Sequence, residues 1–350
     1  MRTPIVIAAG GTAGHVVPAL AVADALRAEG CEVTFVGGER AEAQLVPAAG
    51  YELRPIRVRG LSRTNPVDAA KAGLLAAGAV REARRILRDL RPAAVLGAGG
   101  YVAGPVGLAA IGGRVALVLS EADSHLGITN RTLAPLARRV CLAFPIEGRT
   151  GDRYVVTGRP VPSPATDRVA ARERFNLAPD DTCVIVFGGS LGARSINVAS
   201  IQAFLDAPYR VIHAAGERDM ASLLPRVPAH GYDLRPYIEH FGEALLASDL
   251  CVARSGGSIF EVAAHGRPAI LIPYPHATGD HQASNARWMA EAGAAVIVPD
   301  DELTPQRLRA EVDALLADPA RLAAMSQASA RLARPDAAAD VASAVLEAAA

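Results

Sequence analysis

Short apolar runs alternate with longer segments of helical pattern along the 350-residue chain, and this alternation restricts the possible folds more than any other feature. In the first half the apolar runs are Pro4–Ala9, Glu32–Gly37, Ala93–Gly97 and Ala116–Leu119, and the segments that follow them are Pro18–Glu29, Ala41–Ala49, Gly104–Ile111 and Thr129–Ala137. Strands that are apolar on both sides belong to parallel sheets with helices on both faces. The pattern therefore predicts an α/β fold.

The same pattern restarts after a proline-rich stretch, residues 158–169, that has few apolar side chains. The later apolar runs are Thr182–Phe187, Tyr209–Ala214, Leu250–Ala253, Pro268–Pro273 and Ala295–Val298. We therefore predict two doubly wound, Rossmann-like domains, residues 1–158 and 159–334, with a C-terminal helix in residues 335–350 that packs back on the first domain. Because ligands bind at the carboxyl ends of such strands, we expect a site in a cleft between the domains.

Each half opens with a glycine-rich loop between its first strand and the next helix, Gly10–Gly14 in one half and Gly188–Gly192 in the other. Such a loop lets the backbone approach an anion at a helix N-terminus, although tight packing alone is the commoner reason for it. Neither loop has the dinucleotide or the P-loop pattern. His15 follows the first loop directly, where the positive helix end favours a neutral imidazole that can accept a proton.

The second half carries a further polar loop, Arg254–Ser258, after an apolar run, and Glu261 falls in the helix that follows. Two readings of Glu261 stay open: a carboxylate that interacts with the helix dipole, or one that accepts the two hydroxyls of a ribose. His276, Asp280 and His281 lie close together, but their spacing is not that of a zinc motif, so we predict no metal site there.

Composition excludes some classes of protein. The chain has 36 basic and 36 acidic residues, which argues against a nucleic-acid binder. Residues 92–113 carry no charge, yet their glycines and Pro105 predict a strand, a loop and a helix rather than a membrane span. No secretory signal opens the chain, so we expect a cytoplasmic location. Each cysteine lies in or beside an apolar run and is expected to be a buried, reduced thiol: Cys31, Cys141, Cys183 and Cys251.

Although the net charge of the whole chain is zero, one segment is strongly cationic. Arg54–Arg91 contains ten basic and three acidic residues, which gives it a net charge of +7. The basic residues are Arg54, Arg57, Arg59, Arg63, Lys71, Arg81, Arg84, Arg85, Arg88 and Arg91, and the acidic ones are Asp68, Glu82 and Asp89. Near an anionic leaflet each such charge is worth about 1 kcal/mol, enough together for reversible surface binding. A solvated helix face is the alternative.

An ordered set of motifs gives the chain a resemblance to a known family. The motifs are GGTAGH (Gly10–His15), GLSR (Gly60–Arg63), GAGGYVAGP (Gly97–Pro105), the segment Glu121–Asn130, TGRPV (Thr157–Val161), GGSLGARSIN (Gly188–Asn197), RSGGSIFE (Arg254–Glu261) and HQASNA (His281–Ala286). The chain resembles the MurG-type transferases of glycosyltransferase family 28, which have the two-domain GT-B fold. The resemblance implies an inverting enzyme that moves N-acetylglucosamine from UDP-N-acetylglucosamine to the MurNAc 4-hydroxyl of lipid I, forming lipid II.

The resemblance also implies roles for particular residues. On the donor side, Ser190, Leu191 and Gly192 would hold the UDP diphosphate, Ile238 the uracil, Glu261 the ribose, Gln282 and Asn285 the sugar, and Arg254 would neutralise phosphate charge. On the acceptor side, Thr12, Ala13, Gly14, Gly99, Gly100 and Tyr101 would face the acceptor's pyrophosphate. Inversion requires a base, for which His15 is the candidate, with anion contact as its rival role and Glu121 or Asp123 as alternative bases.

The resemblance further implies a polyprenyl-diphosphate-linked acceptor, no cofactor besides the UDP-sugar substrate, and peripheral attachment to the cytoplasmic face of the membrane through Arg54–Arg91. The chain departs from the family at its acceptor cluster, where Ser120–Asp123 replaces the pattern His-Glu-x-Asn, and at Ala13, Arg159 and Pro162. One residue is also missing between Arg254 and Glu261. Three alternatives follow: a related transferase for another glycolipid or small aglycone, a UDP-sugar 2-epimerase, and a non-catalytic UDP-sugar sensor.

Overall fold

The computed structural model describes residues 2–58, 66–189, 191–228, 230–277 and 280–350, with side chains omitted for 66–76. The chain divides into two compact units, which we describe separately. Unit 1 is Met1–Pro162 with Arg334–Ala350, and unit 2 is Ser163–Ala333. The first boundary lies four residues after the predicted end at 158, because the buried Arg159 side chain is hydrogen-bonded inside unit 1. Arg334 belongs to unit 1 as well, where its side chain packs beside Gly158.

The described part of unit 1 contains a seven-stranded sheet in which every pair of neighbours is parallel. Its strands are β1 (Pro4–Ala8), β2 (Glu32–Gly37), β3 (Glu52–Pro55), β4 (Ala94–Gly97), β5 (Ala116–Glu121), β6 (Arg139–Leu142) and β7 (Tyr154–Val156). Their order across the sheet is β3-β2-β1-β4-β5-β6-β7. Its helices are α1 (Ala13–Ala28), α2 (Ala41–Ala48), α3 (Pro66–Leu90), α4 (Gly100–Gly112), α5 (Ile128–Leu133) and α14 (Ala337–Ala349).

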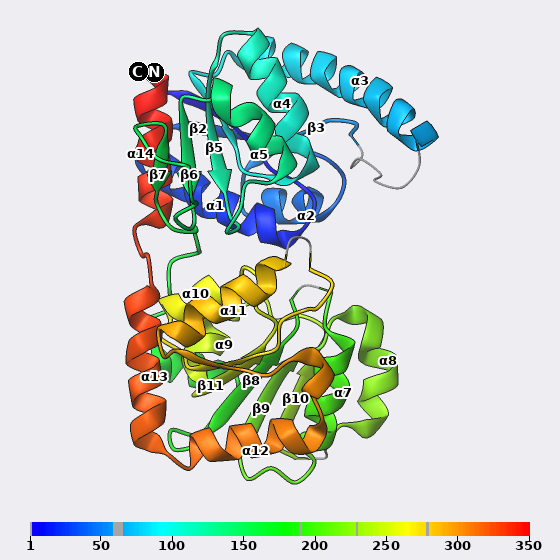
Figure 1. Ribbon diagram of the computed structural model, residues 1–350, viewed down its shortest axis with the longest axis vertical. Helices are drawn as coiled ribbons and strands as arrows, with labels where there is room; N and C mark the ends of the chain where they lie inside the picture. Colours follow the sequence, from blue (N-terminus) through cyan, green and yellow to red (C-terminus); the bar gives the residue numbers. More distant parts are fainter. Residues whose placement is uncertain (1, 59–65, 190, 229, 278–279) are drawn as a thin grey trace. The chain divides into compact units, whose positions relative to one another are not determined.

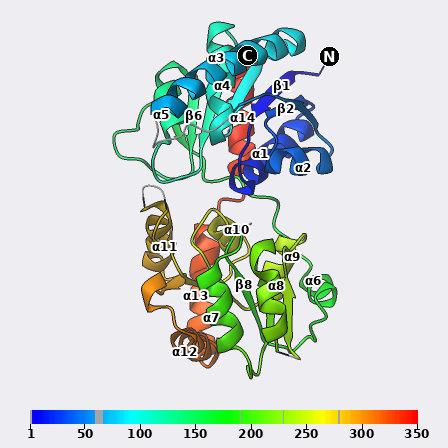
Figure 2. The ribbon, with the colours of Figure 1, turned by 90° about the vertical axis from the view of Figure 1, so that its right-hand side faces the viewer.

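Helices cover both faces of this sheet (Figure 2). Along β1, Ile5 and Ile7 point into a core shared with α1 and α14, whereas Val6 and Ala8 point into a second core shared with α3 and α4. This explains why the strand is apolar at every position. The last helix, α14, packs against α1 and the strands β4, β5 and β6, so the C-terminal segment is part of unit 1 (Figure 1).

Unit 2 repeats the arrangement with a six-stranded parallel sheet of order β10-β9-β8-β11-β12-β13 in its described residues. Its strands are β8 (Cys183–Phe187), β9 (Arg210–Ala214), β10 (Tyr232–Arg235), β11 (Leu250–Ala253), β12 (Ala269–Leu271) and β13 (Ala295–Ile297). Its helices are α6 (Arg168–Arg174), α7 (Arg194–Ala203), α8 (Met220–Leu223), α9 (Phe241–Ala247), α10 (Ile259–Ala264), α11 (His281–Glu291), α12 (Pro305–Leu316) and α13 (Pro319–Leu332). The predicted fold class, two doubly wound α/β domains, is confirmed.

Two smaller predictions are also confirmed. The uncharged residues 92–113 form β4, a glycine turn and α4, and no helix in the described residues is long and apolar enough to cross a membrane. All four cysteines are buried free thiols. Strands β3, β6 and β10 are absent from the sequence-based expectation. β3 and β10 each lie at the edge of a sheet and carry charged side chains, such as Glu52 and Asp233, rather than an apolar run. β6 lies between β5 and β7, but it has only four residues and begins with Arg139.

Candidate active site

The strand order places the polar loops of each unit together. Consecutive strands run outward in opposite directions from the β1–β4 pair in unit 1 and from the β8–β11 pair in unit 2. At such a switch point the loops after the two central strands diverge and leave room for a ligand at the carboxyl edge. Gly10–Gly14 and the Gly99-Gly100 turn follow β1 and β4, while residues 188–192 and 254–258 follow β8 and β11. The candidate residues therefore gather at one switch point in each unit.

The two glycine loops of unit 1 are packed against each other. Gly99 and Gly100 have φ angles of 98° and 75°, in the left-handed region that side chains disfavour. A Cβ atom at Gly100 would lie 1.9 Å from the carbonyl oxygen of Gly10, and one at Gly99 would lie 2.6 Å from Cδ2 of His15. Glycine is required at both positions, and its absence of a side chain is what lets the His15 ring approach the β4–α4 turn.

His15 is the third residue of α1 and is half-buried at the carboxyl edge. Burial lowers its pKa below 6.5, and the nearby positive charge of Arg159 lowers it further, against the opposing effect of Asp123 and Glu42. The hydroxyl of Thr12, the N-cap residue, lies 3.5 Å from Nδ1. The imidazole is therefore neutral near pH 7, the state that a general base requires.

Arg159 connects the linker to this site, a role that the sequence did not reveal. Its buried guanidinium donates to the carbonyl oxygen of Gly14 at 2.5 Å and to that of Ala122 at 3.2 Å. One side chain thus joins the first turn of α1 to the loop after β5. The sequence marks Arg159 only as a departure from the family pattern.

The three candidate bases have different surroundings. Glu121 is buried, and its carboxylate accepts hydrogen bonds from the backbone N–H groups of Asp123 and Gly127 and from the side-chain amide of Asn130, at 2.8–3.2 Å. Burial raises the pKa of Glu121, although these hydrogen bonds oppose the effect. Because its oxygens accept these hydrogen bonds, Glu121 holds the loop that carries Asp123 in place. The negative charge of Asp123 acts to raise the pKa of His15, against the larger effect of burial.

The glycine loop of unit 2 is held equally tightly. Gly192 has a φ of 72°, and a Cβ atom there would lie 1.8 Å from the carbonyl oxygen of Ala215. Arg218 donates two hydrogen bonds to the carbonyl oxygen of Leu191, at 2.9 and 3.2 Å, while the Leu191 side chain is exposed. Ser190, predicted to bind the diphosphate, lies outside the described residues.

A buried polar network fixes the base of this loop. Asn197 donates to the Ala215 carbonyl at 2.8 Å and to a carboxylate oxygen of Asp219 at 2.9 Å, and its side-chain oxygen lies 3.0 Å from Nε2 of His213. The other ring nitrogen of His213 lies 2.7 Å from the Tyr232 hydroxyl. Burial lowers the pKa of His213 to about 3, so the imidazole at the centre of this network is neutral. The oxygen that packs against Gly192 is thus held rigidly.

Arg254 lies at the carboxyl edge of β11, where its guanidinium is hydrogen-bonded to other residues of unit 2. Its guanidinium is buried, pairs with the Asp300 carboxylate at 2.6 Å, and donates to the Ser195 hydroxyl at 2.8 Å and to the carbonyl oxygens of Ile272 and Pro273. These partners engage Nη1 and one N–H of Nη2. The phosphate role of Arg254 stays a prediction.

The remaining donor-side candidates come from three elements around the loop after β11. The hydroxyl of Ser255 donates to the Gln282 carbonyl at 2.7 Å, and the buried Asn285 amide donates to the Ser255 carbonyl at 2.9 Å. These bonds fix the N-terminal turns of α11 beside the loop. Glu261 is half-buried in the first turn of α10, and Ile238 is buried.

Metal-ligating side chains do not converge in the described residues of either unit. Within the part of the chain that the structure describes, no cluster of three or more histidine, cysteine, aspartate or glutamate side chains is arranged to hold a metal ion. His276 forms an edge-on contact with the Tyr274 ring, with centroids 5.5 Å apart.

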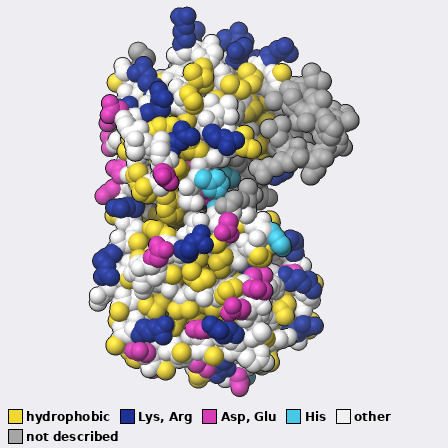
Figure 3. Space-filling view, viewed as in Figure 1, with side chains coloured by type: hydrophobic (Ala, Val, Ile, Leu, Met, Phe, Trp, Pro, Cys, Tyr) yellow, Lys and Arg dark blue, Asp and Glu magenta, His cyan; other side chains and the backbone are white. Residues whose placement is uncertain are grey.

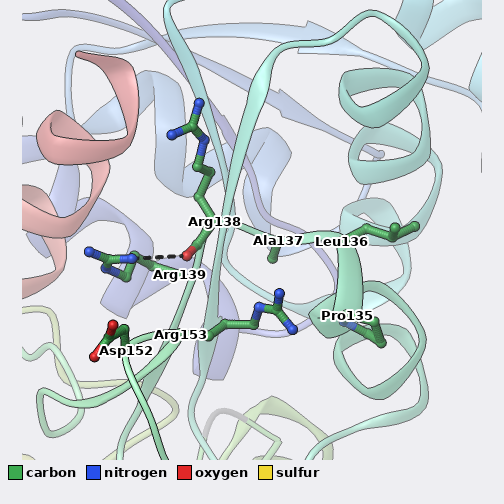
Figure 4. A pocket seen from close by; sticks show the side chains of 7 residues that line it. All are labelled: Pro135, Leu136, Ala137, Arg138, Arg139, Asp152 and Arg153. Carbon is green, nitrogen blue, oxygen red and sulfur yellow. Dashed lines mark hydrogen bonds between the residues drawn. The ribbon is translucent and has the colours of Figure 1, made fainter.

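A separate basic pocket of about 390 Å³ lies at the opposite edge of the unit 1 sheet (Figure 4). It is lined by the first residue of β6 and by residues that precede β6 and β7: Pro135, Leu136, Ala137, Arg138, Arg139, Asp152 and Arg153. Because β6 begins at Arg139 and β7 at Tyr154, this is the amino edge, away from His15. Three arginines line this pocket, but it is not part of the site at the carboxyl edge.

Comparison with known proteins gives consistent matches over the whole chain. The glycosyltransferase family 28 N-terminal domain matches residues 5–142, and the family's C-terminal domain matches residues 183–341. A protein of Alkalilimnicola ehrlichii named UDP-N-acetylglucosamine–N-acetylmuramyl-(pentapeptide) pyrophosphoryl-undecaprenol N-acetylglucosamine transferase is 43% identical over 356 residues, 99% of each chain. A protein of the same name from Moorella thermoacetica is 40% identical over 354 residues, 95% of each chain.

A solved structure supports the same relationship. The crystal structure of Acinetobacter baumannii MurG superimposes with a TM-score of 0.77 at 28% sequence identity, covering 99% of this chain and 100% of that one.

Proposed function

This chain belongs to glycosyltransferase family 28, and on that premise we propose that it transfers N-acetylglucosamine from UDP-N-acetylglucosamine to the N-acetylmuramyl 4-hydroxyl of lipid I, forming lipid II. The observation that carries the proposal is 43% identity, over 99% of both chains, to a protein named for that reaction. The enzyme is a hexosyltransferase, and peptidoglycan synthesis is its pathway.

The chemistry is a single displacement at the anomeric carbon of the sugar. The acceptor oxygen forms a bond to that carbon, the bond from the carbon to the UDP oxygen breaks, and the acceptor proton passes to a base. His15 suits the role of base because its imidazole is neutral, sits at a helix N-terminus and lies against the Gly99 turn. Asp123 would stabilise the imidazolium that forms, since its negative charge favours the protonated ring.

The donor is proposed to bind unit 2. The diphosphate would bind where the tight Gly192 turn leads into the N-terminus of α7, because the first N–H groups of a helix lack partners within the helix. Glu261 would accept the ribose hydroxyls, while Gln282 and Asn285 would contact the sugar from the first turns of α11. No metal ion or cofactor is part of this proposal.

Release of UDP from UDP-N-acetylglucosamine tests the proposal when it is measured with and without a lipid I analogue. We expect release only when the analogue is present, because the acceptor supplies the nucleophile. An epimerase would instead convert the donor alone, and a sensor would bind it without turnover. Fast transfer to another glycolipid with none to the lipid I analogue would contradict the assigned acceptor.

Attachment to an anionic membrane surface, on its cytoplasmic face, is proposed through the cationic segment Arg54–Arg91. Arg59 and Arg63 lie outside the described residues, as do the side chains of Asp68 and Lys71. In the described part of α3, the exposed basic side chains are Arg81, Arg84, Arg85 and Arg88. Figure 3 shows lysine or arginine side chains gathered along the edge of unit 1 where this part of α3 lies. That density of like charge favours an anionic surface over a purely solvated face.

The double variant Arg81→Gln/Arg85→Gln tests this attachment in a vesicle sedimentation assay. At about 1 kcal/mol per charge, we expect binding to phosphatidylglycerol vesicles to weaken by roughly 30-fold, and binding of the wild type to fall as salt rises. Arg321→Gln/Arg331→Gln, which removes two exposed charges from unit 2, is the matched control and should bind as the wild type does. Equal binding by both double variants would contradict a role for α3.

A further inference from the structure

Glu42 is a buried carboxylate beside the acceptor-side loops, and nothing in the sequence motifs marks it. It is the second residue of α2, and its side chain is 0% exposed. A buried carboxylate is costly unless several donors satisfy it. The groups that donate hydrogen bonds to Glu42 therefore indicate its role.

Three hydrogen bonds reach Glu42 from three different segments at the carboxyl edge of unit 1. The N–H of Gly11, after β1, donates to Oε2 at 2.8 Å. The N–H of Gly38, after β2, donates to Oε1 at 2.9 Å. The hydroxyl of Tyr101, in the first turn of α4, donates to the same Oε1 at 2.9 Å. One side chain thus joins both loops of the switch point to a third.

The glycines around Glu42 are spaced to admit its carboxylate. A Cβ atom at Gly10 would lie 2.8 Å from Oε1, and one at Gly37 would lie 2.9 Å from Cγ. A Cβ atom at Gly38 would lie 2.5 Å from the Tyr101 hydroxyl and 3.0 Å from Oε1. The glycine-rich ends of β1 and β2 therefore leave room for the carboxylate.

The protonation states suit this arrangement. Burial alone raises the pKa of Glu42, but the hydrogen bonds outweigh it and hold the pKa below 4.5. Burial and the bond to Glu42 raise the pKa of Tyr101 to about 12, so its hydroxyl stays a donor. The ionised carboxylate accepts all three hydrogen bonds, which a neutral amide of the same shape cannot do.

We infer that Glu42 is a positioning residue for the acceptor side of the transferase: it clamps the Gly10-Gly11 loop to Tyr101 and so fixes the first turn of α1, with His15, against the Gly99-Gly100 turn. The inference rests on the proposed function for its catalytic consequence. Glu42 does not contact the reacting atoms itself; it acts through the loops that it joins.

The Glu42→Gln variant tests the clamp. Its amide nitrogen must face at least one of the three donors, so we expect kcat/KM for a lipid I analogue to fall at least tenfold. The affinity for UDP, measured by calorimetry, should stay unchanged because the donor residues belong to unit 2. The acidic limb of the pH profile should also move to lower pH, since the lost negative charge no longer favours protonation of His15. A residue that only stabilises the fold would leave that midpoint in place.

Tyr101→Phe is the second variant, because it removes one of the three bonds and keeps the carboxylate. We expect a smaller loss of acceptor kcat/KM and an unshifted pH profile. Hydrogen exchange gives a readout without turnover: in Glu42→Gln the amides of Gly11 and Gly38 should exchange faster, while those of unit 2 keep wild-type rates.

Wild-type acceptor kinetics in Glu42→Gln, or unchanged exchange at Gly11 and Gly38, would overturn the inference. If Glu42→Gln does not fold, wild-type kinetics in Tyr101→Phe would overturn it as well. Lack of transfer by the wild-type enzyme would refute the proposed function instead, and the exchange rates would then decide whether the clamp exists.

Discussion

The His15→Ala variant is expected to have a kcat about 10²–10⁴-fold below that of the wild type, with unchanged affinity for UDP. That range is what a positioned general base contributes. The imidazole is the neutral, half-buried group at the start of α1, whereas the Glu121 oxygens are engaged by three donors. Steady-state kinetics at saturating donor and acceptor give kcat, and calorimetry gives the affinity for UDP.

The control for this experiment is His230→Ala, which removes an exposed histidine of unit 2 and should leave kcat unchanged. Retention of more than about a tenth of wild-type kcat would show that His15 is not the base. A raised KM for the acceptor with kcat intact would instead favour its rival role as an anion contact. Because burial lowers the pKa of His15, wild-type activity should fall only at a pH below the ordinary value of 6.5.

The Glu261→Ala variant is expected to bind UDP about 10–100-fold more weakly, since a hydrogen bond to a charged group contributes about 1.5–3 kcal/mol. Glu261 lies in the first turn of α10, after the β11 loop that Ser255 ties to α11. Calorimetric titration with UDP measures the loss directly. Glu291→Ala, which removes an exposed carboxylate of α11, is the matched control and should bind UDP as the wild type does.

The same variant separates the two readings of Glu261 that the sequence left open. If the carboxylate only interacts with the helix dipole, the free energy of unfolding should fall by about 0.3–1 kcal/mol while UDP affinity stays constant. Urea denaturation measures that change. Unchanged UDP affinity would therefore contradict the ribose assignment and favour the dipole.

The sequence predicted the fold well because the parallel sheets are buried on both faces. The apolar runs that became β1, β4, β8 and β11 contribute side chains to cores on both faces of their sheets, so each residue of the strand must be apolar. Strands at the edge of a sheet need not be apolar at every position, and β3 and β10 carry charged residues for that reason. Strand order was not readable, because periodicity does not say which strands are neighbours.

The candidate site was only partly predictable. The glycine turns and His15 could be found because a loop that follows a strand must lie at the carboxyl edge. Arg159 and Glu42 act through single side chains that reach 145 and 31 residues along the sequence, and no local pattern encodes such contacts. Arg254 pairs with Asp300, 46 residues further along the chain, which no local pattern encodes either, and its phosphate role stays a prediction.

The configuration of the new glycosidic bond tests the central claim most directly. UDP-N-acetylglucosamine carries an α-linked sugar, so a single displacement assisted by a base must give a β-linked product. We expect mass spectrometry of the reaction with a lipid I analogue to show the addition of one N-acetylglucosamine, and proton NMR to show a β linkage to the MurNAc 4-oxygen. An α linkage, or consumption of the donor without any product on the acceptor, would contradict the account.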